Sequence, residues 1–507
     1  MVACSIAAVC ACGAFAQGMA TGVVYDDANR NGVRDAGENG IASVCVSNGR
    51  EVVQTDASGA WTLPVDDDTI FFAIKPSQWM TPVNAEQVAQ SFYIHKPNGS
   101  PELEAKGVAP TGPLPSSIDF PLYARPESAQ FKMLLFGDPQ ARGVREVNFV
   151  THDVVEECIG TDAAFGISLG DIVADDPNLF REINESIAQI GIPWYNTFGN
   201  HDYNRGSGSD EMSDETFERF YGPGSYAFEY GQVCFLIMDD VYFKPDGKYE
   251  GRFTDDQLAF VQNYLALVPE EKLVVMTMHI PIVACKNRDA MFAILAKHPH
   301  TFSISAHTHT QFNVFAGAEQ GWPGAEPHHH LVQATVCGSW WCGTFDELGI
   351  PHATMNDGAP NGYSVVSFDG NKYSVAFKAA RRPADYQMNI YLPDEVAQAD
   401  AGATEILVNV FAGSERSIVE MQLGKDGAWT RLEQTKTIDP ECLRMHKQNE
   451  FLNEEVFGWK MDYPSETTHM WKGVLPANPA VGTHTVTVRT TDMYGQTWEG
   501  KRIVRVR

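Results

Sequence analysis

The stretch FKMLLFGDPQ, residues 131–140, decides the fold, because an apolar run of strand length ends abruptly in glycine, aspartate, proline and glutamine. Four later segments share this design: AAFGISLGDIV (163–173), IPWYNTFGNHD (192–202), LVVMTMHIP (273–281) and TFSISAHTH (301–309). Helix-like stretches such as 144–159 and 178–190 lie between several of them. Strands that alternate with helices predict a layered α/β domain whose polar strand ends meet in one cleft.

Five short motifs stand at or near those strand ends. In chain order they are Asp138-Pro139-Gln140, Gly170-Asp171, Gly199-Asn200-His201-Asp202, His279 and His307-Thr308-His309. Carboxylate, carboxamide and imidazole groups suit divalent ions such as Mn, Zn or Fe. A pair of such ions needs a bridging carboxylate, for which Asp171 is the natural candidate. Taken alone, His279 is more often a core histidine and Asp171 a helix cap, but five motifs in order predict a two-metal centre.

With these motifs, the middle of the chain resembles the calcineurin-like metallophosphoesterase superfamily. Asp138-Pro139-Gln140 resembles its D-P-Q subgroup of exported bacterial proteins with N- and C-terminal β modules. The resemblance implies a four-layered α/β/β/α core flanked by two small β-sandwich domains. It also implies a phosphatase or phosphodiesterase that hydrolyses phosphomonoesters or phosphodiesters by attack of metal-bound hydroxide on phosphorus.

The resemblance further implies roles for individual residues. One divalent metal ion would be held by Asp138, Gln140, Asp171 and His309, and the other by Asp171, Asn200, His279 and His307. His201 would contact the phosphate and protonate the leaving oxygen, and Asp202 would orient it. Asn200 or His307 would help to stabilise charge in the transition state.

Two positions depart from the pattern of that superfamily. Gln140 stands where histidine is usual, and Ala306 stands where glycine is usual. Glutamine offers a neutral carbonyl oxygen in place of a nitrogen, so the first metal site is expected to be weaker or to favour a harder ion. This leaves an alternative open, namely a catalytically weak cell-surface protein that binds glycans and is built on a phosphoesterase core.

The segments on either side of the core alternate short apolar runs with Gly, Asn and Asp turns, which is typical of β-sandwich modules. We therefore expect an N-terminal β-sandwich module at 17–124, the catalytic domain at 125–381 and a C-terminal β-sandwich domain at 382–507. Residues 22–41, GVVYDDANRNGVRDAGENGI, resemble the calcium-binding B-type repeats of surface proteins. Five side chains in this stretch carry oxygen atoms that could bind calcium: Asp27, Asn29, Asn31, Asp35 and Glu38. They predict either a calcium-binding loop or a turn without an ion.

The first sixteen residues, MVACSIAAVCACGAFA, carry no charge and end in the A-x-A pattern of a signal-peptide cleavage site. We expect residues 1–16 to be a signal peptide and the protein to be exported, to the periplasm, the cell surface or the medium. A lipid anchor at Cys12 is the alternative. No later run reaches the ~18 apolar residues that would predict a transmembrane helix.

Sixty-five acidic residues against 37 basic ones give a formal net charge of −28. Such a surface repels the phosphate backbone of long nucleic acids, which argues against them as partners. The expected partner is a small phosphorylated substrate, or a phosphorylated glycan or lipid head group, attracted mainly by the metal ions.

Weaker signals lie outside the five motifs. Trp341, Asn361 and Tyr363 are expected, with Trp340, to form a wall against which a ring of the substrate stacks, although core packing is an equal alternative. The loop 204–215 is expected to form part of the rim that selects substrates. Asp175 is expected to lie in a solvated turn.

Overall fold

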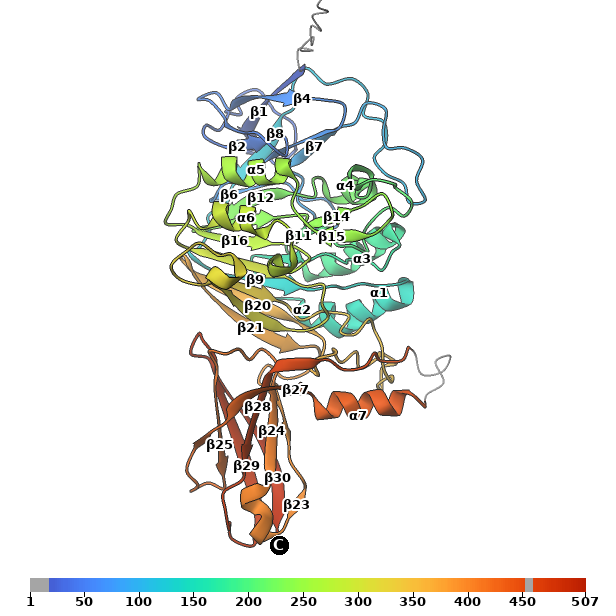
Figure 1. Ribbon diagram of the computed structural model, residues 1–507. Helices are drawn as coiled ribbons and strands as arrows, with labels where there is room; N and C mark the ends of the chain where they lie inside the picture. The colour runs from blue at the N-terminus through green and yellow to red at the C-terminus, as the bar shows by residue number, and fades with distance from the viewer. Residues whose placement is uncertain (1–17, 452–458) are drawn as a thin grey trace, which may run out of the picture.

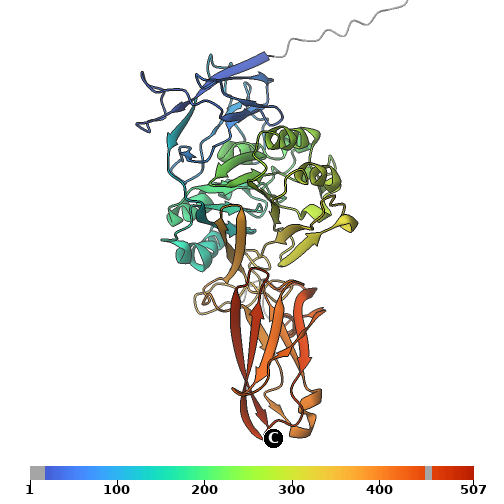
Figure 2. The same cartoon turned by 90° about the vertical axis from the view of Figure 1, so that its left-hand side faces the viewer.

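The computed structural model describes residues 18–451 and 459–507, so the predicted signal peptide lies outside the described residues. Three parts follow one another along the molecule, with the mixed α/β core between two β-rich ends (Figures 1 and 2). Across those two described ranges, no helix is both long and apolar enough to cross a membrane.

Two sheets form the centre of the core, a five-stranded one and a six-stranded one. The first has the order β11 (Trp194–Asn196), β10 (Phe165–Ser168), β9 (Gln130–Phe136), β20 (Gly362–Asp369), β21 (Lys372–Ala379). The second has the order β12 (Tyr226–Tyr230), β13 (Val233–Ile237), β16 (Leu273–Thr277), β17 (Thr301–Ser305), β19 (His328–Val332), β18 (Phe312–Ala316). Strands β9, β10 and β11 run parallel, as do β13, β16, β17 and β19, so the carboxyl ends within each set meet at one edge.

Helices cover the outer face of each sheet. The five-stranded sheet carries α1 (Val144–Val150), a π-helical turn (Thr151–Val155), α2 (Glu156–Cys158) and α3 (Phe180–Ile187). The six-stranded sheet carries α5 (Asp255–Leu265) and α6 (Arg288–Leu295). The four-layered α/β/β/α prediction is confirmed.

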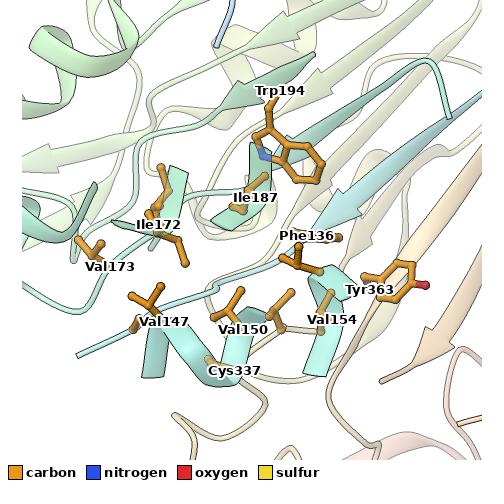
Figure 3. Packing of buried hydrophobic residues seen from close by; sticks show 14 of the residues in the cluster. Phe136, Val147, Val150, Val154, Ile172, Val173, Ile187, Trp194, Cys337 and Tyr363 are labelled. Carbon is orange, nitrogen blue, oxygen red and sulfur yellow. The ribbon is translucent and has the colours of Figure 1, made fainter. Parts of the chain in front are cut away.

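Strand β9 shows why the apolar runs are continuous instead of alternating. Met133 and Leu135 pack between the two sheets, whereas Leu134 and Phe136 pack against the helices, and all four side chains are buried. Figure 3 shows Phe136 among helical residues such as Val150. A strand that is covered on both faces needs apolar residues at every position, each contributing about 1.5–3 kcal/mol on burial.

Two small sheets make the N-terminal module and enclose a core that includes Trp61, Phe71 and Leu122. One sheet has the order β4 (Ala60–Val65), β1 (Gly18–Asp26), β8 (Phe120–Ala124), β6 (Trp79–Met80). The other has the order β3 (Val52–Gln54), β2 (Cys45–Ser47), β5 (Thr69–Ala73), β7 (Phe92–His95).

The five candidate calcium ligands lie in one loop after β1. The side-chain amides of Asn29 and Asn31 both donate to Asp35 Oδ2, at 2.7 and 2.9 Å. Asp27 accepts the backbone N–H of Asn31, and Glu38 accepts that of Asp35. These bonds close the loop by themselves, and calcium binding stays a prediction.

The C-terminal module is a second sandwich, whose core includes Val408, Trp471 and Val488. One sheet has the order β22 (Met388–Tyr391), β24 (Glu405–Val410), β28 (Glu466–Val474), β27 (Glu433–Ile438). The other has the order β23 (Glu395–Val396), β30 (Thr497–Val506), β29 (Gly482–Thr491), β25 (Ile418–Leu423), β26 (Thr430–Arg431). Between β27 and β28 the chain leaves the sandwich as α7 (Pro440–Asn449), which extends sideways from the sandwich, below the core, in Figure 1. The boundaries predicted at residues 124 and 381 stay predictions.

Candidate metal centre

Loops at the carboxyl ends of five core strands meet in one place. Asp138 follows β9, Asp171 follows β10, Asn200 follows β11, His279 follows β16 and His307 follows β17. The structure brings all seven predicted metal ligands into one cluster: Asp138, Gln140, Asp171, Asn200, His279, His307 and His309. All of them except His307 are buried.

His279 lies at the centre of this cluster. Its Nδ1 donates to the carbonyl oxygen of Leu169 at 2.8 Å, which leaves Nε2 for other partners. Nε2 faces Asn200 Oδ1 and His307 Nδ1, both at 3.0 Å, and Asp171 Oδ2 at 3.3 Å. The ligand atoms of Asp171, His279 and His307 all lie within 4.8 Å of one another. Nitrogen and oxygen lone pairs that converge in this way fit a divalent cation.

His309 repeats this arrangement a short distance away. Its Nδ1 donates to the carbonyl oxygen of Gly338 at 2.5 Å, so that Nε2 faces Asp138 Oδ2 at 3.3 Å. That carboxylate oxygen is buried and lacks a hydrogen-bond donor among the described residues. A buried carboxylate oxygen without a donor is costly unless a cation or a proton lies beside it. The pair therefore has the chemistry of a second group of metal ligands.

Gln140 lies between the two groups. Its amide nitrogen is 3.3 Å from Asp171 Oδ2, and its Oε1 is 3.5 Å from Cys337 Sγ. A half-turn of the terminal amide exchanges oxygen and nitrogen without a change of shape and brings the oxygen to the ligand side. Cys337 also lies 3.6 Å from His309 Nδ1, and no motif in the sequence marked it as a neighbour of the site.

The backbone is left-handed at five of the seven candidate ligands. The φ angle is 31° at Asp138, 41° at Gln140, 45° at Asp171, 70° at His307 and 51° at His309. Residues other than glycine rarely adopt this region, and each instance costs about 1–3 kcal/mol. Such strain persists where the surroundings dictate it, and it is concentrated at functional sites.

Two glycines let the ligand loops approach one another. A Cβ atom on Gly199 would lie only 2.0 Å from the backbone nitrogen of Asp171. Gly170 has a φ of +86°, and a Cβ there would lie 2.7 Å from His279 Nδ1. Glycine is needed in the G-D and G-N-H-D motifs because Asp171 and His279 lie so close to the backbone that a side chain would not fit.

The titration of the cluster follows from burial and from mutual charge. Burial raises the pKa of Asp138 to about 7. Burial works against a charge on His279 as well, but the carboxylate of Asp171 outweighs it and raises the pKa of His279 to about 10. Burial lowers the pKa of His307 to about 3 and that of His309 to about 4. These two imidazoles are therefore neutral, which is the form that binds metal ions.

His201 lies beside the ligands and points elsewhere. Its backbone N–H donates to Asp171 Oδ1 at 2.8 Å, while its Nδ1 lies 2.7 Å from Asp175 Oδ1. The other oxygen of Asp175 pairs with Arg205 at 2.8 Å. Burial alone would lower the pKa of His201, but the hydrogen bond to Asp175 and the charge of Asp171 raise it to about 9.

The prediction that Asp202 orients His201 is wrong. The carboxylate of Asp202 is fully buried and accepts the backbone N–H groups of Gly199 at 2.9 Å and Val173 at 3.1 Å, so it holds the turn itself. Asp175, which was expected to lie in a solvated turn, takes the orienting position. Its backbone N–H donates to the carbonyl oxygen of His201, which brings the two loops together.

For Trp341, Asn361 and Tyr363 the structure supports the core-packing alternative and not the substrate wall. Trp341 is 1% exposed, Asn361 is 5% exposed and Tyr363 is 6% exposed. Asn361 donates to Asp153 on the π-helical turn, and Tyr363 packs against Phe136 (Figure 3). The three side chains belong to the core behind the site, because apolar packing and satisfied polar groups both favour burial.

Aromatic side chains do flank the site, from other positions. The half-buried ring of Trp340 stacks on His309, with ring centroids 4.0 Å apart and an interplanar angle of 29°. Tyr249 lies edge-on to His307 at 6.0 Å and is 40% exposed. It comes from the hairpin of β14 (Val241–Phe243) and β15 (Tyr249–Gly251), which no sequence motif connects with the ligands.

A groove of about 360 Å³ opens beside His201. Its lining is polar and largely acidic: Glu104, Asp175, Asp176, Asn178 and Arg205, with Ala105, Ala174 and Pro177. Arg205 comes from the loop 204–215, which was expected at the rim, and Glu104 comes from the N-terminal module.

The C-terminal module reaches the His-Thr-His loop through buried polar groups. The backbone N–H of Gln311 donates to Asp357 Oδ2 at 2.6 Å, and that oxygen lies 3.1 Å from His469 Nε2 on β28. His469 Nδ1 in turn donates to Asn409 Oδ1 on β24 at 2.7 Å. All four residues are buried. The module is thereby tied to the loop two residues beyond His309.

Three sequence models that describe parts of one family match the chain. "N terminal of Calcineurin-like phosphoesterase" matches residues 28–105, "Calcineurin-like phosphoesterase" matches residues 131–311, and "C terminal of Calcineurin-like phosphoesterase" matches residues 330–498. No curated protein sequence matches the chain. Among solved structures, the chain has some likeness to the purple acid phosphatase PPD1 from seeds of yellow lupin, Lupinus luteus. The two are 11% identical over 67% of each chain, with a TM-score of 0.37.

Proposed function

The chain belongs to the calcineurin-like phosphoesterases with N- and C-terminal modules, and from this we propose that it is an exported enzyme with two divalent metal ions that hydrolyses phosphomonoesters or phosphodiesters. Family membership supports phosphoesterase activity and divalent metal binding. The pair of ions, the residue roles and the export are parts of the proposal.

One observation carries the proposal for two ions. His279 and His309 each donate Nδ1–H to a backbone carbonyl oxygen, which fixes the tautomer and leaves Nε2 aimed at the carboxylates of Asp171 and Asp138. At His309, whose imidazole is neutral, the Nε2 lone pair and the carboxylate oxygen of Asp138 repel each other at 3.3 Å unless a cation or a proton lies beside them. His279, whose pKa is raised, shares a proton with Asp171 in the ion-free protein and would release it when an ion binds. Backbone carbonyls that orient histidines in this way are typical of metal sites.

The ligand sets follow from the two groups. One ion would be held by Asp138, Gln140, Asp171 and His309, and the other by Asp171, Asn200, His279 and His307. Nitrogen, carboxylate and amide donors suit Mn, Zn or Fe. When bound, two such ions supply positive charge to the phosphoryl oxygens and lower the pKa of the attacking water.

His201 is the proton donor in this proposal. Asp175 holds Nδ1–H, so the Nε2–H of the imidazolium is free to donate to the leaving oxygen. The side chain is 34% exposed, so a leaving oxygen can approach it from solvent. Asn200 or His307 would help to stabilise the charge that develops on the phosphoryl group.

The proposed substrates are small phosphorylated compounds, or phosphorylated glycan or lipid head groups, outside the cytoplasm. The surplus of acidic residues leaves the metal ions as the main attraction for phosphate.

The first experiment is turnover of p-nitrophenyl phosphate and bis-p-nitrophenyl phosphate with added Mn or Zn, before and after chelation, together with metal analysis. We expect two ions per chain and turnover that is lost on chelation and restored by metal. Fewer than one ion per chain with neither ester cleaved would sink the enzyme proposal and favour the glycan-binding alternative.

Variants then separate the roles of three histidines. His201→Ala is expected to keep both ions while kcat falls by about 10²–10⁴-fold. His279→Ala is expected to lose bound metal. His152→Ala, on the exposed side of the helix that begins with α1, is the matched control and changes neither. Loss of metal in His201→Ala would show that the role assigned to His201 is wrong.

A further inference from the structure

We propose that Trp459 of the C-terminal module, together with Arg142 and Trp340, forms a subsite that recognises a ring in the alcohol portion of the ester. This inference rests on the proposed function, since it names the class of ester that the same metal centre would accept. It assigns substrate selection to a module that carries none of the ligands.

A continuous series of contacts leads from the candidate ligands to this module. Trp340 stacks on His309, and Arg142 donates from Nη2 to the carbonyl oxygen of Trp340. The guanidinium of Arg142 lies 4.7 Å from the ring centroid of Trp459. The backbone carbonyl of Trp459 accepts the N–H of Gly343 at 2.9 Å, which fixes the segment against the core.

The backbone at Trp340 is held in a conformation that a bulky residue rarely adopts. Its φ is 52°, and the φ of the next residue, Trp341, is 53°. The backbone N–H of Trp341 donates to the carbonyl oxygen of Cys337, and its indole N–H donates to the carbonyl oxygen of Pro139 at 3.1 Å. With Trp341 held in this way, the neighbouring ring of Trp340 lies half-buried on His309. Strain of this kind is tolerated where a side chain must face a ligand.

The exposure of Trp459 also supports the proposed subsite. It is 57% exposed even though it contacts Arg142, so part of the indole is open to solvent. Arg142 itself is paired with Glu146 at 2.9 Å, which balances its charge. A charge-balanced surface of two indoles and a guanidinium does not favour a second phosphate. It suits the apolar face of a flat ring.

The shared chemistry is therefore a ring, which a sugar or a nucleobase supplies and a linear alcohol such as glycerol does not. Tyr249, on the other side of the His-Thr-His motif, adds an exposed aromatic edge near His307. A phosphoryl group at the candidate metal centre would thus have one aromatic side chain beside His307 and another beside His309.

The test measures kcat/KM for glucose 6-phosphate, AMP and glycerol 3-phosphate, or for their methyl diesters if only diesters are cleaved. In Trp459→Ala, the ratio of ring esters to the glycerol ester is expected to fall about tenfold, since stacking on an aromatic side chain is typically worth that much. Trp459→Phe is expected to retain most of the ratio. Tyr463→Ala is the matched control, because Tyr463 is exposed in the same segment but packs on His446.

Each outcome decides something. A fall with glucose 6-phosphate alone identifies a sugar, and a fall with AMP alone identifies a nucleobase. An unchanged ratio in Trp459→Ala, or equal losses on all three esters, overturns the subsite while leaving the phosphoesterase in place. A wild-type protein that cleaves no ester overturns the proposed function, and the subsite with it. Thermal unfolding of each variant checks that the fold is intact.

Discussion

The two β modules flank the same core, but they are joined to different parts of it. In the N-terminal module, Lys96 lies among Glu215 and Glu218 of α4 (Glu215–Tyr221), at 2.6 and 3.2 Å, and none of the three contacts a candidate ligand. In the C-terminal module, His469 pairs with Asp357, which accepts the N–H of the ligand loop itself. Two modules of similar architecture therefore differ in how close to the candidate ligands their buried polar contacts end.

The largest expected effect is that of Asp357→Ala. Removal of this carboxylate leaves the buried N–H groups of Gln311 and Ala359 without an acceptor and takes away the oxygen that faces His469 Nε2, so the free energy of unfolding should fall by about 3–5 kcal/mol. Because the His-Thr-His loop loses its support, bound metal and kcat should fall as well. Chemical denaturation and metal analysis measure the two effects. Unchanged metal content would mean that the C-terminal module is only a scaffold.

Lys96→Met makes the matching change in the N-terminal module. It leaves buried carboxylates uncompensated, so the free energy of unfolding should fall by about 3 kcal/mol. Because the cluster is separate from the ligands, kcat and metal content should stay within about twofold of the wild type. A large loss of kcat would remove the contrast between the modules.

Asp175→Asn tests a place where the N-terminal module approaches the proposed proton donor, since Glu104 shares the groove with Asp175. The Asp175 carboxylate favours the charged form of His201, so its loss lowers the pKa of His201. The protonated acid is then lost at lower pH, and the alkaline limb of the pH–rate profile should move down by roughly one unit. An unmoved limb would contradict the pairing of these two residues.

Trp341→Phe removes the indole N–H that donates to Pro139 and keeps an aromatic ring in the core. The lost hydrogen bond should lower the free energy of unfolding by about 1 kcal/mol. Since Trp341 lies behind the site, the choice between ring and glycerol esters should not change. A change in that choice would restore Trp341 to the substrate wall.

The smallest expected effect is that of Arg50→Ala, which removes an ion pair between the N-terminal module and Asp256 on α5. Both side chains are more than half exposed, at 57% and 61%. Solvent screens such a pair, so the free energy of unfolding should change by about 0–1 kcal/mol. Denaturation at low and high salt measures it, and a larger effect would mean that the exposed contacts also hold the module.

Much of the fold and the clustering of the candidate metal ligands could be predicted because both depend on strand ends. Continuous apolar runs followed by Asp138, Asp171 or His279 specify a buried parallel strand and the place where it stops. The direction of a side chain within a tight turn is not specified in this way. Asp202 is adjacent to His201 in sequence, yet its carboxylate turns back to the N–H of Gly199, while Asp175 reaches His201 through pairing of two loops.

The same limit explains why the sequence did not predict which of Trp340, Trp341 and Tyr249 would lie beside the candidate ligands. Trp340 and Trp341 are neighbours in a left-handed turn, where neither the strand period nor the helix period tells which ring is buried. Tyr249 arrives from a hairpin far along the chain, and its position depends on how that hairpin folds over the site. Only the tertiary structure brings these residues to the candidate ligands.

The left-handed backbone at five candidate ligands links the lifetime of the protein to its metal supply. The backbone strain destabilises the ion-free chain, and the free energy of metal binding would offset it. Bound ions would therefore stabilise the folded protein against unfolding. A ligand at a hundred times its dissociation constant adds about 2.7 kcal/mol to the free energy of unfolding. In surroundings that are poor in divalent ions, the chain would open more often and be degraded sooner, so metal scarcity would lower the amount of the protein as well as its activity.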